Sequence, residues 1–126
     1  MTVNWVALVD DEAPVRAALG RLLRLADYAV LPFASGEEFL DSLASRVPDC
    51  VLLDVHMPGL TGLQVQARLR EAGLDLPVVF ITASDDAEIE RSALDVGGLC
   101  VLRKPFSSEL LLDAVGVALG RRPGHG

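Results

Sequence analysis

The segment CVLLDVHMPGLTG occupies residues 50–62 and joins an apolar run to a carboxylate and a turn. Residues 50–53 have the length and composition of a buried strand, and Asp54 follows them directly. One proline and two glycines then predict a tight loop in which the backbone can approach a site. In an open parallel sheet, ligands lie beyond the carboxyl ends of the strands, which is where Asp54 would stand.

Three other apolar runs end in residues of a similar kind. Residues 6–9 lead into Asp10 and Asp11, residues 78–81 lead into Thr82, and residues 99–102 lead through Arg103 to Lys104. If these runs are parallel strands, their carboxyl ends share one edge, so the polar side chains could meet in one crevice. Three carboxylates, a hydroxyl and an ammonium suggest a magnesium ion, an aspartate nucleophile and a phosphoryl group.

Helical patterns separate the strand-like runs. They comprise an amphipathic stretch over residues 15–26, capping boxes that open helices at Ser35 and Thr61, a helix capped by Asp85 or Asp86 that runs to Val96, and a last helix beginning at Ser107 or Ser108. A weaker strand covers residues 28–33, where Pro32 suits a sheet edge. Five strands and five helices in strict alternation predict one α/β domain with a parallel sheet. The pattern covers residues 1–120 and leaves 121–126 as a flexible tail or the start of a linker.

The composition is that of a globular domain of common size. Of 126 residues, 51% are hydrophobic and 23% are charged. A net charge of −7 and a pI of about 4.6 disfavour nucleic-acid binding by this domain, because phosphate contacts need clustered Lys and Arg. No apolar run approaches the ~20 residues of a membrane span, and no secretory signal is visible. Cys50 and Cys100 lie in apolar runs without metal-site spacing, which fits small buried residues in a reducing cytoplasm.

Asp54 is the candidate nucleophile, because a carboxylate can attack phosphorus to give an acyl phosphate. A lone Asp in a loop is more often a helix cap, but Asp10 and Asp11 would lie close by if the first and third runs are neighbouring strands. Three such carboxylates repel one another, and Mg²⁺ bound through oxygen atoms relieves that repulsion. The tight loop after Asp54 could also present the carbonyl of His56 to the metal, while the imidazole faces solvent.

Two further residues have an ordinary and a functional interpretation. Thr82 is either a plain strand-end threonine or a hydroxyl that donates to a phosphoryl oxygen. Lys104 is either a surface charge or a point charge that pairs with Asp54 and then with phosphate. Taken singly, each residue favours the ordinary interpretation, and only the combination of polar residues at four strand ends suggests the functional one.

These residues, in this order, resemble the receiver domain of two-component response regulators, the CheY-like family. The matching motifs are Val9-Asp10-Asp11-Glu12, the run from Leu53 to Gly62, Ile81-Thr82-Ala83 and Lys104-Pro105-Phe106. The resemblance covers residues 5–120. Residues 15–19 and 33–40 are also similar to receivers that precede helix-turn-helix output domains.

The resemblance implies a flavodoxin-like sheet of strand order 2-1-3-4-5, the order found in CheY. It implies that Asp54 accepts phosphate from a phosphohistidine on a sensor histidine kinase. Asp11, Asp54 and the His56 carbonyl would bind Mg²⁺ directly, and Asp10 would act partly through water. Thr82 and Lys104 would contact the phosphoryl group, and the Lys104–Pro105 peptide bond would be cis.

The same resemblance implies a cytoplasmic signalling domain, and a homodimer through the last two helices would be one way to transmit its state. Such a domain catalyses only its own phosphorylation and dephosphorylation, and it could form the N-terminal part of a transcriptional regulator. One position departs from the family. Receivers usually carry Tyr or Phe three residues before the Lys, whereas this chain has Val101, a short β-branched residue without a ring that could swing inward.

Two other functions remain open at this point. An Asp-nucleophile phosphatase that turns over external substrates would use the same acids, although such chemistry often needs a second acid two residues after the nucleophile, where this chain has His56. An inactive receiver fold that only binds proteins is the other alternative. The complete set of acids together with Lys104 argues against it.

Overall fold

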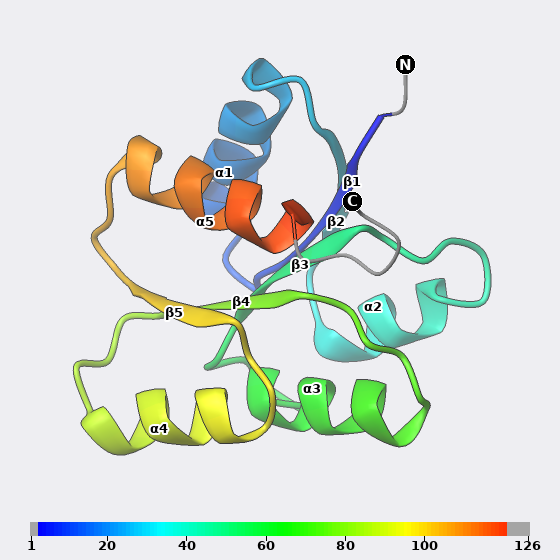
Figure 1. Cartoon of the computed structure of the whole chain (residues 1–126), viewed down its shortest axis with the longest axis vertical. Helices are drawn as coiled ribbons and strands as arrows, with labels where there is room; N and C mark the ends of the chain where they lie inside the picture. The colour runs from blue at the N-terminus through cyan, green and yellow to red at the C-terminus, as the bar shows by residue number, and fades with distance from the viewer. Residues whose placement is uncertain (1–2, 121–126) are drawn as a thin grey trace.

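The structure is a computed structural model that describes residues 3–120 (Figure 1). Five strands and five helices alternate along the chain, as the sequence predicts. The strands are β1 (Trp5–Val9), β2 (Ala29–Phe33), β3 (Cys50–Asp54), β4 (Val78–Thr82) and β5 (Cys100–Arg103). The helices are α1 (Ala13–Leu25), α2 (Gly36–Ser42), α3 (Gly62–Glu71), α4 (Ala87–Asp95) and α5 (Ser108–Gly120).

All four strand pairings are parallel, and the order β2-β1-β3-β4-β5 confirms the predicted sheet. The register pairs Val9 with Leu53, and Asp54 with Ile81. The carboxyl ends of β1, β3 and β4 therefore stop at nearly the same level. That alignment is what gathers side chains from distant parts of the sequence at one edge.

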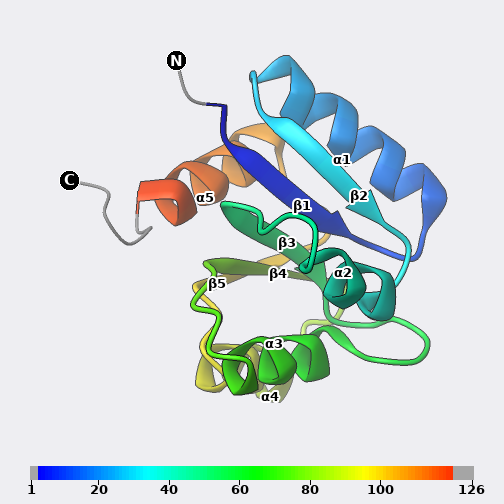
Figure 2. The ribbon, with the colours of Figure 1, turned by 90° about the vertical axis from the view of Figure 1, so that its right-hand side faces the viewer.

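Helices cover both faces of the sheet, with α1 and α5 on one face and α2, α3 and α4 on the other (Figures 1 and 2). Alternate residues of each strand supply the two cores, because successive side chains point to opposite faces. In β1, for example, Val6 and Leu8 belong to the α1/α5 core, while Ala7 and Val9 belong to the other. The central strands are buried throughout, which explains their continuous apolar sequences.

The predicted helix starts are present. Ser35 accepts a hydrogen bond from the backbone N–H of Glu38, and Thr61 forms a complete capping box with Gln64. Of the two aspartates proposed to cap α4, Asp86 is the one that does so. Pro32 lies in the edge strand β2, as expected for a residue that cannot donate to the sheet.

The glycine at the start of α3 lets that helix begin close to the end of β3. A Cβ placed on Gly62 would collide with the backbone carbonyl of Asp54. The Gly62 N–H instead donates to the Val55 carbonyl, at 2.9 Å. The loop predicted after Asp54 therefore folds tightly against the strand end, and it holds that carboxylate in a fixed backbone frame.

The remaining predictions concern the two cysteines, the Lys104–Pro105 bond, membrane spans and the tail. Cys50 and Cys100 lie on strands that β4 separates, and they form no disulfide with each other. The Lys104–Pro105 peptide bond is cis, as expected. Across residues 3–120, no helix combines the length and apolar character needed to cross a membrane. The expected tail, 121–126, lies outside the described residues.

Candidate functional site

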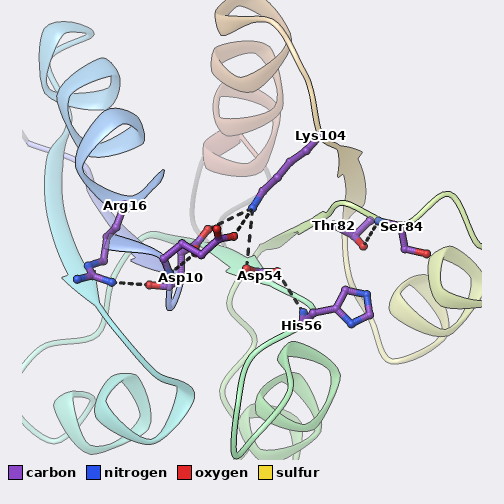
Figure 3. A network of polar contacts seen from close by, with 8 residues as sticks. Asp10, Arg16, Asp54, His56, Thr82, Ser84 and Lys104 are labelled. Carbon is purple, nitrogen blue, oxygen red and sulfur yellow. Dashed lines mark hydrogen bonds and ion pairs between the residues drawn. The ribbon is translucent and has the colours of Figure 1, made fainter. Parts of the chain in front are cut away.

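Four predicted site residues meet at the carboxyl edge of the sheet (Figure 3). Asp10 follows β1, Asp54 ends β3, Thr82 ends β4 and Lys104 follows β5. Asp10, Asp54 and Thr82 are 1%, 5% and 1% exposed, so two carboxylates and a hydroxyl are almost completely removed from solvent. Lys104 covers them with a side chain that is 22% exposed.

The ammonium of Lys104 is shared among three carboxylates. Its Nζ lies 3.6 Å from Oδ2 of Asp10, 3.8 Å from Oε1 of Glu12 and 4.0 Å from Oδ2 of Asp54. None of these contacts is a close hydrogen-bonded pair, and the nucleophile candidate is the most distant partner. A single positive charge therefore compensates three acids that stand together.

The pKa of Asp54 is raised from 3.8 to about 6, and burial of the carboxyl is the largest cause. The charge of Asp10 is the second cause of this rise, and that of Asp11 adds a smaller effect in the same direction. The His56 N–H and the Lys104 ammonium oppose these effects and lower it. A raised carboxyl pKa of this kind is typical of a functional site. A bound cation would stabilise the ionised carboxylate and so lower this pKa.

Backbone contacts fix the acids in place. The N–H of His56 donates to Oδ1 of Asp54 at 3.1 Å, and the N–H of Glu12 donates to Oδ1 of Asp10 at 2.9 Å. The guanidinium of Arg16 reaches back from α1 and donates to the Asp10 backbone carbonyl at 2.7 Å. In both aspartates one carboxylate oxygen is thus held by the chain, and the other faces the shared space.

Thr82 is oriented by the loop that follows it. Its Oγ1 accepts a hydrogen bond from the backbone N–H of Ser84 at 3.0 Å. A hydroxyl that accepts in this way still has its proton to donate. Thr82 therefore retains a donor for an oxygen that enters the site.

The acids fit a hard divalent cation. Carboxylate oxygens of Asp10, Glu12 and Asp54 all lie within 4.8 Å of one another. Oδ2 of Asp10 is buried and has no hydrogen-bond partner among the described residues. A buried oxygen that accepts no hydrogen bond, 3.6 Å from the Lys104 ammonium and beside two further carboxylates, suits Mg²⁺, which takes oxygen ligands and keeps several waters. Asp11 is exposed and stands outside this group of three.

The model of the response regulator receiver domain matches residues 6–116, which is most of the chain. This chain belongs to the response regulator receiver family. Curated relatives agree with that assignment. Transcriptional regulatory protein TdiR of Thauera aromatica is 43% identical over 116 residues, a match that covers 92% of this chain and 51% of TdiR. Response regulator MprA of Mycolicibacterium vanbaalenii is 42% identical over 116 residues, covering 92% of this chain and 50% of MprA.

Solved receiver structures have the same fold. A response regulator receiver protein from Burkholderia phymatum is 48% identical, with a TM-score of 0.83 and coverage of 95% of this chain and 98% of that one. The crystal structure of FixJ-N is 27% identical, with a TM-score of 0.90 and coverage of 96% and 97%. The chain spans about half the length of TdiR and MprA.

The acids at the start of α1 are arranged differently from one another. Asp11 is exposed and lies outside the clustered carboxylates, whereas Glu12 belongs to them, and the direct binding of a metal by Asp11 stays a prediction. Glu12 lies within the first motif, and the sequence alone predicts no role for it. Its position after two consecutive acids was the signal available.

Two further receiver positions match their description from sequence. His56 is exposed, two residues after Asp54. Val101 is half-buried, pairs with Phe80 across β4 and β5, and packs against the α2/α3/α4 core. An isopropyl group therefore stands at the position where the resemblance to receivers implies an aromatic ring.

Proposed function

We propose that this receiver accepts a phosphoryl group from a phosphohistidine of a sensor histidine kinase onto Asp54, and that it changes conformation in response. The observation that carries the proposal is the Asp54 carboxylate, 5% exposed, with Asp10 beside it and the Lys104 ammonium 4.0 Å away. In the reaction an oxygen of Asp54 forms a bond to phosphorus while the bond from phosphorus to the histidine nitrogen breaks.

Asp10, Asp11, Asp54 and the carbonyl of His56 would hold a magnesium ion, and the buried Oδ2 of Asp10, which accepts no hydrogen bond, supports such a site. Bound Mg²⁺ would neutralise negative charge on the transferring phosphoryl group. Two side chains would supply the nucleophile and a positive charge. Asp54 attacks, and Lys104 offers a point charge to the phosphoryl oxygens once they arrive.

Thr82 would donate its hydroxyl proton to a phosphoryl oxygen. We expect its movement to be transmitted through the loop that ends at the Asp86 cap of α4. A homodimer through α4 and α5 is one outcome that this movement could favour. We also infer a cytoplasmic location. We further infer that the receiver itself binds no nucleic acid, because its net charge is −7. A DNA-binding output domain would belong to the other half of a TdiR-like protein.

The receiver would catalyse only its own phosphorylation and dephosphorylation. The rival is a phosphatase with an Asp54 nucleophile, and it lacks support at the position two residues after Asp54, where an exposed His56 replaces an acid. An inactive, protein-binding receiver would not need a buried acid opposed by an ammonium.

One experiment separates the three functions. The protein is incubated with Mg²⁺ and acetyl phosphate, or with p-nitrophenyl phosphate, and both intact mass and released product are followed. The proposal predicts that acetyl phosphate adds a single phosphoryl group and that p-nitrophenol is not released continuously. Sustained turnover that depends on Asp54 would instead indicate a phosphatase. Failure to gain mass from acetyl phosphate and from a kinase phosphohistidine would indicate the inactive fold.

A further inference from the structure

Glu12 occupies the N-cap position of α1, yet its side chain makes no cap hydrogen bond. Side chains that cap helices well are short, and they accept from the second or third N–H of the helix. Here the second helical residue is Pro14, which has no N–H to offer. The carboxylate of Glu12 instead extends across the site, where its Oε1 lies 3.8 Å from the Nζ of Lys104.

Two of the three acids around Lys104 therefore come from the turn between β1 and α1. Its Nζ is nearer to Asp10 and Glu12, at 3.6 and 3.8 Å, than to Asp54, at 4.0 Å. The ammonium thus lies within 4.0 Å of all three acids, and the acids of the β1–α1 turn supply its two shorter contacts.

These two acids differ in their freedom to move. Asp10 is buried, and both its Oδ1 and its backbone carbonyl accept hydrogen bonds, from the Glu12 N–H and from Arg16. The side chain of Glu12 is 61% exposed, and within the described residues it has no other ion pair and no side-chain hydrogen bond. Glu12 is therefore the partner that Lys104 can exchange without disturbing the fold.

We propose that Glu12 is a positioning residue that competes with the phosphoryl group for the Lys104 ammonium. This inference rests on the proposed function. Phosphorylation of Asp54 brings oxygens that Lys104 can contact only if it leaves the carboxylate of Glu12. The resting pair therefore weakens phosphoryl binding and is released when the phosphoryl group is held.

Beryllofluoride, a phosphoryl mimic, measures this competition at saturating Mg²⁺. We compare the affinities of wild type, Glu12→Gln and Glu12→Asp by calorimetry, and we measure Mg²⁺ affinity separately without beryllofluoride. Glu12→Asp keeps the charge but shortens the side chain by one methylene. Glu38→Gln removes a charge from another exposed glutamate, on α2, and is the matched control.

Both Glu12 variants are expected to bind beryllofluoride about two- to fivefold more tightly than wild type, the range for one exposed ion pair. Glu38→Gln is expected to change the affinity little. In a Lys104→Ala background, Glu12→Gln should have no further effect, because the group being competed for is gone. If Lys104→Ala forms no beryllofluoride complex, the rate of labelling by acetyl phosphate supplies the same comparison.

Three results would overturn the inference. An equal gain from Glu12→Gln with and without Lys104 would show a general effect of charge. A loss of Mg²⁺ affinity in both Glu12 variants, but not in Glu38→Gln, would make Glu12 a metal ligand. Unchanged affinities in both Glu12 variants would show that the pair has no role. If wild type itself forms no Asp54-dependent complex, the proposed function fails together with this inference, whereas in the other cases the proposed function stands.

Discussion

Replacing Asp54 with Asn is expected to stabilise the metal-free protein at neutral pH. Burial, and then the charge of Asp10, raise the pKa of Asp54 from 3.8 to about 6. Because the folded state resists ionisation more than the unfolded chain does, the protonated carboxyl contributes its stability in full below about pH 4 and loses it as the pH rises through 6. The two pKa values differ by about two, which corresponds to about 3 kcal/mol of lost stability above pH 6. Asn keeps an acceptor for the His56 N–H and has no charge to bury.

Urea unfolding in EDTA tests this magnitude at several pH values between about 4 and about 8. The free energy of unfolding of Asp54→Asn should exceed that of wild type by about 3 kcal/mol at the upper end, and the difference should shrink toward zero as the pH falls to about 4. Asp41→Asn removes a charge from an exposed site on α2 and should stay within about 0.5 kcal/mol of wild type. The reasoning is refuted if Asp54→Asn stabilises no more than Asp41→Asn, or by the same amount at every pH.

Three other substitutions have expected outcomes. A Cβ on Gly98 would lie 2.5 Å from the Phe80 ring, so Gly98→Ala should lower the free energy of unfolding by about 1–3 kcal/mol, and an unchanged urea midpoint would contradict this close approach. The exposed imidazole of His56 lies close to Asp54 and should shield its phosphoryl group from water, so His56→Ala should speed the loss of phosphate from Asp54 with Mg²⁺ present. A slower or equal decay, followed by intact mass, would count against this shielding. Val101→Tyr should be tolerated and should enlarge the phosphorylation-dependent change in amide exchange over α4, β5 and α5. If wild type already shows a large change there and the tyrosine adds nothing, residue 101 does not limit the switch.

The main features of the fold could be predicted from hydrophobic patterns, because each buried strand is a short apolar run and each helix has its own start signal. Strand order could not be derived in this way, since periodicity does not say which strands are neighbours. The order came from the resemblance to CheY-like receivers. The choice between Asp85 and Asp86 as the α4 cap also needed the structure, because both residues suit a cap.

The positions of the candidate site residues could be predicted where the backbone geometry of the sheet alone determines them. Asp54, Thr82 and Lys104 meet because the carboxyl ends of parallel strands share an edge. Glu12 and Arg16 were missed, because the direction of a long side chain at the start of a helix depends on its neighbours in space rather than on spacing in the sequence.

A buried amide on α3 shows the same limit. Helical spacing puts the apolar residues Val65, Leu69 and Ala72 on one side of α3, and this pattern does not include Gln66. Gln66 is 4% exposed and donates through Nε2 to the carbonyl of Val96, at the end of α4. A distant helix end supplies the acceptor for this buried Nε2, while Oε1 has no hydrogen-bond partner among the described residues, and local sequence carries no information on either.

The most direct test of the central claim is the position of the phosphoryl group. Wild type and Asp54→Asn are incubated with Mg²⁺ and acetyl phosphate, and intact mass is measured under conditions that preserve acyl phosphates. We predict that wild type gains one phosphoryl group, that EDTA prevents the gain, and that Asp54→Asn gains none. An equal phosphorylated fraction in wild type and Asp54→Asn would contradict the account, because the phosphoryl group would then reside on a residue other than the buried acid opposite Lys104.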